Sequence, residues 1–231
     1  MSLLATDAHC HIGGANLNFE AAVCAINRTQ WSELFTNNNP KIKRVFGLFL
    51  GEALTHTDNE IDSDMEALKS FLSRADAIGE FGLDKRFVPV LPFYRQEKIF
   101  DAHISLVGES HLPFVLHCVG AWGFLLKKIR GASKKTKLGN FLLHSVGCSL
   151  SLASDFESMG AFFSLSERQL NTRNGLEIAS NVRIDRILLE SDDVPSESTY
   201  LNVLGRLAQI RNISEDKLSE TIRNNFYEFY K

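Results

Sequence analysis

The chain has 231 residues, 44% of them hydrophobic, and a formal net charge of −3 at pH 7. This length and apolar content suit one barrel-sized domain over residues 1–231. This net charge excludes the overall positive field that is typical of nucleic-acid-binding proteins. Because the sequence shows no basic leader and no long apolar stretch, we expect a cytoplasmic protein without membrane contact.

Short apolar runs alternate with helical patterns along the chain, which is typical of parallel β/α architecture. The expected strands lie near residues 3–11, 21–27, 44–50, 75–82, 113–118, 140–146, 161–166 and 186–192. Helices are predicted over 30–37, 61–73 and 94–108, and a pair of helices closes the chain, with Ser214 as an N-cap. We therefore predict an α/β fold, a (β/α)8 barrel of the TIM type.

The first expected strand carries two histidines two residues apart. Side chains alternate in a strand, so Asp7, His9 and His11 point one way and Cys10 the other. Two imidazoles on one face can bind a single metal ion, although the same spacing also suits ordinary polar residues at a strand end.

Four more potential ligands stand at the ends of later apolar runs. Glu80 lies between Gly79 and Gly82, whereas His117, His144 and Asp192 each end a run of strand-forming residues. Any one of them could be a hydrogen-bonded residue capping its strand. Recurrence in one chain favours a metal site at the mouth of a barrel, because barrel enzymes keep their chemistry at strand ends.

The chain resembles the TatD-related metal-dependent deoxyribonucleases, which belong to the amidohydrolase-like barrels. The matching segments are residues 7–11, 79–84, 95–100, 112–117, 143–144, 189–192 and 225–229. The resemblance implies two divalent ions, zinc, manganese or magnesium. It implies that His9, His11 and Asp192 hold one ion, that His117 and His144 hold the other, and that Glu80 bridges them.

Three positions depart from the family's pattern. Leu48-Phe49 stands where members carry His-Pro, and Val119-Gly120 follows His117 where a basic residue is usual. After Asp192, residues 193–195 lead quickly to a helix in place of a substrate-facing loop. The ligands are kept while the residues expected to contact phosphate are not.

Several other residues receive structural interpretations. The four cysteines, at positions 10, 24, 118 and 148, show no framework spacing and indicate reduced, intracellular thiols, of which Cys10 and Cys118 are expected to pack behind the barrel wall. His103 fits the core edge of a helix, while His56 and His111 fit loops. The basic stretch 127–137 favours a solvated helix end over a phosphate-binding patch.

The reaction we expect is metal-assisted hydrolysis, with Asp192 as general base, Glu80 as bridging ligand, and Asp7 and Glu190 orienting the ligands. Three functions fit the sequence: a nuclease acting on DNA, a hydrolase of the same barrel acting on a small amide, ester or phosphate, and a non-catalytic metal-binding barrel. The sequence indicates no obligate protein partner.

Overall fold

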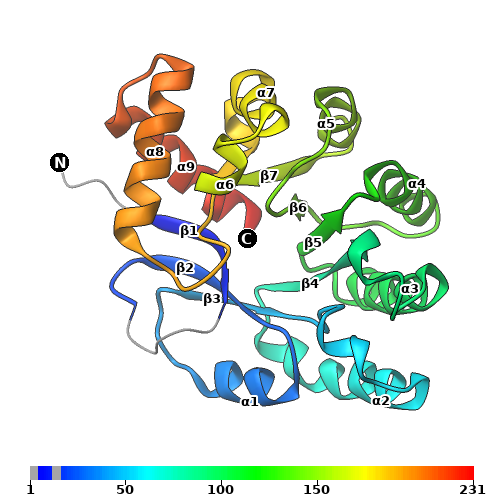
Figure 1. Cartoon of the computed structure of the whole chain (residues 1–231). Coiled ribbons are helices and arrows are strands. Elements are labelled where there is room, and N and C mark those ends of the chain that lie inside the picture. Colours follow the sequence, from blue (N-terminus) through cyan, green and yellow to red (C-terminus); the bar gives the residue numbers. More distant parts are fainter. Residues whose placement is uncertain (1–4, 12–16) are drawn as a thin grey trace. The chain divides into compact units, whose positions relative to one another are not determined.

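The computed structural model describes residues 5–11 and 17–231 (Figure 1). The strands form a closed barrel in the order β1 to β8, and the pairs β3–β4, β4–β5, β7–β8 and β8–β1 are parallel. The predicted (β/α)8 fold is therefore confirmed. No helix among the described residues is both long and apolar enough to cross a lipid bilayer.

The strands are β1 (Thr6–His11), β2 (Glu20–Ala25), β3 (Ile42–Phe46), β4 (Ala77–Asp84), β5 (Phe114–Val119), β6 (Phe141–Leu143), β7 (Ala161–Leu165) and β8 (Ile187–Leu189). The α-helices are α1 (Arg28–Thr36), α2 (Asp58–Leu68), α3 (Phe93–Ser110), α4 (Trp122–Ser133), α5 (Leu150–Glu157), α6 (Glu167–Leu170), α7 (Arg173–Asn181), α8 (Glu197–Arg211) and α9 (Glu215–Phe229). Each predicted strand overlaps an observed one, and residues 3–4 of the first lie outside the described residues.

The helix predicted over 61–73 has different ends in the structure. It begins at Asp58, because Thr57 and Glu60 form a capping box in which each side chain bonds the backbone N–H of the other residue. It ends at Leu68, and a 3-10 helix continues over Lys69–Arg74. The final helix begins as predicted, with the Ser214 side chain accepting a hydrogen bond from Lys217 N.

The chain divides into two compact units, so a single domain over residues 1–231 stays a prediction. The first unit comprises the described residues of Met1–Val23 together with Asn39–Lys43 and Leu142–Lys231. In it, β8 pairs with both β7 and β1. Helices α8 and α9, orange and red in Figure 1, pack together, and α9 covers β8 and β1. Asn225 of α9 donates to Ile184 O and Ile187 O, and Tyr230 Oη donates to Ala8 O. These bonds fix α9 to β1, which carries His9 and His11, and to β8, which leads to Asp192.

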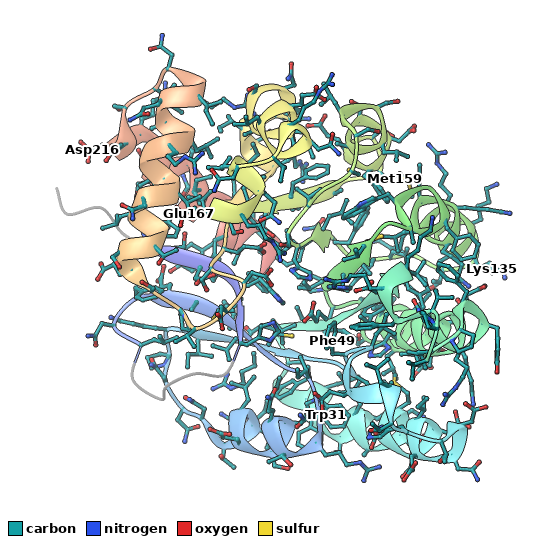
Figure 2. All side chains as sticks on the ribbon, in the orientation of Figure 1. Trp31, Phe49, Lys135, Met159, Glu167 and Asp216 are labelled. Atoms are coloured by element: carbon teal, nitrogen blue, oxygen red, sulfur yellow. The ribbon has the colours of Figure 1, made fainter. Side chains whose placement is uncertain are left out.

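The second unit comprises Cys24–Asn38 and Arg44–Phe141. In it, β4 pairs with β3 and β5, and α3 packs on β4. The Trp31 side chain, labelled in Figure 2, joins α1 to the neighbouring backbone by donating to Ala25 O and Gly47 O. Gln96 of α3 accepts from Asp84 N and donates to Asp84 O, which fixes the end of β4.

Candidate metal centre

Three predicted ligands of the first unit lie within reach of one ion. One ligand atom each from His9, His144 and Asp192 lies within 4.8 Å of the other two. The rings of His9 and His144 are 4.2 Å apart, and Asp192 Oδ1 lies 3.9 Å from His9 Nε2 and 3.5 Å from His144 Nδ1. Both histidines are buried. Two imidazoles and a carboxylate at these distances fit a divalent metal ion, whereas the family resemblance implied that His144 binds the other ion.

The backbone after β8 brings Asp192 to the end of β1. Asp192 N donates to His9 O, and His11 N donates to Asp193 O, both at 3.1 Å. Asp192 has a φ of 57°, a left-handed conformation that aspartate adopts more readily than most residues. His11 lies beside this segment, with its ring 5.1 Å from that of His9.

Two site residues lie beyond the strands in which they were predicted. Strand β6 ends at Leu143 and β8 at Leu189, so His144 and Asp192 belong to the loops that follow. Glu190 and Asp192, which we expected in a strand near residues 186–192, therefore both follow the end of β8. Ser145 links the two carboxylates, because its N–H donates to Glu190 Oε1 (2.6 Å) and its hydroxyl donates to Asp192 Oδ2 (3.0 Å).

Two buried carboxyl groups support this loop arrangement. Asp7 Oδ1 accepts from the backbone N–H groups of His9 (3.2 Å) and Ser191 (3.1 Å), and Glu190 also accepts from the Ser164 hydroxyl. Burial raises the pKa of Asp7 to about 7. Burial likewise raises the pKa of Glu190 to about 8, although the nearby His144 acts in the opposite direction. Among the described contacts, both groups hold backbone and hydroxyl groups around the ligands.

Sequence reasoning missed a polar network on the outer side of Asp192. Helix α6, on which Figure 2 labels Glu167, also carries Arg168 and Gln169. Arg168 Nη2 donates to Asp192 Oδ2 (3.1 Å) and to Ser145 Oγ (2.7 Å), and Gln169 Nε2 donates to Ser145 Oγ (2.7 Å). The sequence signal for this turn is Ser166 with Gln169, which form a capping box directly after an apolar run.

In the second unit, His117 lies between two carboxylates. Its Nδ1 is 3.4 Å from Glu80 Oε2, and its Nε2 is 3.0 Å from Asp84 Oδ2. A carboxylate that binds one ring nitrogen of histidine fixes the orientation of the ring and leaves the other nitrogen for a metal. Asp84 binds Nε2 and so orients the ring of His117. The other nitrogen, Nδ1, lies on the side of Glu80 and is the one suited to bind an ion.

Asp84 had no predicted role. It is buried, and it also forms a two-pronged ion pair with Arg86. Burial raises the pKa of this carboxyl, but hydrogen bonds from His117 and Arg86 outweigh it and hold the pKa of Asp84 below its usual range. The anion needed to orient His117 is thus maintained.

The residues to which the sequence analysis gave structural roles lie in the core, in a helix or in loops. All four cysteines are buried thiols that form no disulfide among the described residues, and Cys10 donates to Ala22 O. His103 is buried in α3 and His111 ends that helix, whereas His56 lies in a loop beside Asp64. In the basic stretch, Lys127, Lys134, Lys135 and Lys137 are exposed.

The comparisons with known proteins assign the family. The profile of the family described as TatD related DNase matches residues 6–231. The chain belongs to this family. The likeness covers both units, and the resemblance inferred from the motifs is confirmed.

Two relatives share less than a quarter of the aligned residues with this chain. A TATDN1 homolog from Vairimorpha ceranae is 23% identical over 179 residues, 68% of this chain and 66% of that protein. A metal-dependent hydrolase from Methanocaldococcus jannaschii is 24% identical over 169 residues, 67% of this chain and 62% of that protein. The chain thus spans less than two thirds of the length of these relatives. The crystal structure of YjjV, a TatD homolog from Escherichia coli, superposes with a TM-score of 0.76 at 20% identity, covering 91% of this chain and 85% of the other, and supports the fold alone.

Proposed function

We propose that this protein is a metal-dependent nuclease that hydrolyses phosphodiester bonds in DNA. Its ligands for two divalent ions are His9, His11, Glu80, His117, His144 and Asp192. The observation that carries the proposal is the cluster of His9, His144 and Asp192, contributed by segments far apart in sequence. Membership of a family described as DNases supports DNA as the substrate.

The two oxygens of Asp192 have separate tasks in this proposal. Oδ2 accepts from Ser145 and Arg168, whereas Oδ1 faces His9 and His144. Oδ1 is therefore the atom that accepts the proton of the attacking water and passes it to the leaving oxygen. Ser145 prevents the carboxylate from turning. Divalent ions in such a site supply Lewis-acid polarisation of a phosphoryl oxygen and a lowered pKa of water.

A second candidate is hydrolysis of a small amide, ester or phosphate at the same centre. One observation favours it: Val119-Gly120 offers no basic side chain after His117, where the family resemblance led us to expect one. The positive charge that binds a long nucleic-acid backbone must then come from other residues of the chain.

The deciding experiment measures metal content and substrate together. Purified protein is analysed for zinc, manganese and magnesium and then assayed on single-stranded and double-stranded DNA with manganese or magnesium. We expect bound metal and slow cleavage of DNA. Turnover of a small phosphoester or amide without any cleavage of DNA would establish the second candidate. Bound metal without turnover of any substrate would establish a binding protein.

The first mutational prediction concerns Asp192. Asp192→Asn keeps the shape of the side chain but accepts no proton, so kcat should fall at least about 1000-fold with little change in KM. Asn also tolerates the left-handed backbone found there. The matched control is Asp193→Asn, one residue further along and exposed, which should keep full activity. Comparable kcat in the two variants would exclude Asp192 as the base.

A further inference from the structure

The side chain of Arg168 forms an ion pair with Asp192. Its Nη2 lies 3.1 Å from Asp192 Oδ2, on the side of the carboxylate that faces away from His9 and His144. The Arg168 side chain is nevertheless 68% exposed. An arginine held at a buried centre but open to solvent can be reached by a substrate that approaches from outside.

Most of the guanidinium of Arg168 is available to a ligand. A guanidinium carries five N–H donors, and its edge matches two oxygens of a phosphate. Both hydrogen bonds that Arg168 makes to the described residues use Nη2. Nε and Nη1 make none within that part of the chain, so three N–H donors, one on Nε and two on Nη1, remain for a ligand beside Asp192.

The last part of the basic stretch, residues 134–137, lies near the start of β5 and not at the end toward which His117 lies. Within the second unit, Phe114 N at the start of β5 donates to Asn140 O, so the chain after α4 has returned to the start of that strand. His117 lies toward the other end of β5. Lys134, Lys135 and Lys137 follow α4 and precede Asn140, so they lie on the part of the chain that leads back to the start of β5.

We propose that Arg168 binds the non-bridging oxygens of the substrate phosphate beside Asp192. It would supply the positive charge that the family resemblance led us to expect after His117. The inference rests on the proposed function, because it names the chemical group that this centre recognises. Its substrate class is a phosphodiester, for which one fixed guanidinium provides both charge and orientation.

The test measures binding of a fluorescein-labelled single-stranded oligonucleotide with phosphorothioate linkages to the metal-loaded protein. Arg168→Gln should weaken binding about 10- to 100-fold, because hydrogen bonds to charged groups are worth about 1.5–3 kcal/mol. The slope of log K against log salt should become shallower by about 0.7, the value for one phosphate contact on a single strand. Arg168→Lys should be intermediate, since lysine keeps the charge without the planar edge.

The matched control is Arg173→Gln, which removes the same charge from an exposed arginine paired with Glu177. It should leave affinity and slope unchanged. Metal affinity is measured in every variant by titration. A parallel loss of metal and oligonucleotide in Arg168→Gln would overturn the proposal, because Arg168 would then only position Asp192. Unchanged affinity and slope would overturn it as well.

The same data separate this inference from the proposed function. If the wild type cleaves no phosphodiester while binding still depends on Arg168, the nuclease proposal fails and the phosphate contact stands. If the wild type and Arg168→Gln both cleave DNA and have the same KM, the nuclease proposal stands and the phosphate contact is refuted.

Discussion

His103 is a buried histidine whose surroundings favour its neutral form. Its Nδ1 donates to Ile99 O (2.8 Å) and its Nε2 accepts from Leu48 N (3.0 Å), so each ring nitrogen has one partner and one proton suffices. The ring also stacks on Phe81 at 4.5 Å. Burial lowers the pKa of His103 to about 4.

This shift predicts a loss of stability in acid. The pKa of histidine is about 6.5 in the unfolded chain, so the unfolded state binds the extra proton between pH 6.5 and about 4, and stability falls as pH decreases through that range. The loss amounts to about 3 kcal/mol between pH 7 and pH 4 at about 1.4 kcal/mol per pKa unit. His103→Gln can keep both hydrogen bonds without titrating. Urea unfolding at several pH values should therefore give a shallower acid loss in the variant, and equal pH profiles would contradict the assignment.

At the scale of elements, the β4–β5 pair positions Glu80. The register advances by three residues on β4, from Ile78 to Phe81, for two on β5, so β4 contains a bulge at Gly79 and Glu80. Bulges redirect side chains and often lie next to active sites. Beyond the bulge, Gly82 packs so closely on β5 that an added Cβ would lie 1.7 Å from His117 O. A side chain at position 82 would displace the strand that carries His117.

Gly82→Ala should consequently destabilise the protein by about 3 kcal/mol or more, because backbone must move to admit one methyl group. The matched control is Gly131→Ala in α4, where an added Cβ would meet nothing within 4 Å. That change should stabilise the protein by up to about 1 kcal/mol through helix propensity. Chemical unfolding of both variants checks the pair. Equal stabilities would show that β4 and β5 do not depend on this close approach.

The strands and the site residues show which features of this fold could be predicted from the sequence. Apolar runs and their polar ends were sufficient to predict all eight strands and to bring His9, His144 and Asp192 into consideration, because both signals are local. The exact strand ends were not predictable. They depend on hydrogen bonds between distant segments, such as that of Asp192 N with His9 O. Arg168 was missed for the same reason, since its role depends on Ser145 and Asp192, which no local pattern connects to α6.

At the scale of the whole molecule, the six proposed ligands come from both compact units. His9, His11, His144 and Asp192 belong to the first, whereas Glu80 and His117 belong to the second. Within the first unit, His9, His144 and Asp192 lie far apart in sequence and come together only in the folded chain. Metal binding and folding should then be linked, because an ion that binds the folded state alone stabilises it by mass action.

The last prediction is a metal-dependent gain in stability that requires the ligands. With manganese or zinc at about 100 times its Kd, the free energy of unfolding should rise by about 2.7 kcal/mol for one site, and chelation should remove the gain. His144→Ala should lose much of this increment, and Glu80→Gln should lose more, because a bridging carboxylate serves both ions. His111→Asn is the matched control: it removes an exposed imidazole at the left-handed end of α3, a conformation that asparagine adopts readily, so it should keep the wild-type increment. Thermal unfolding with metal and with chelator measures all four proteins. The same increment in His144→Ala as in the wild type would mean that His144 holds no ion, and the proposed binuclear centre would have to be abandoned.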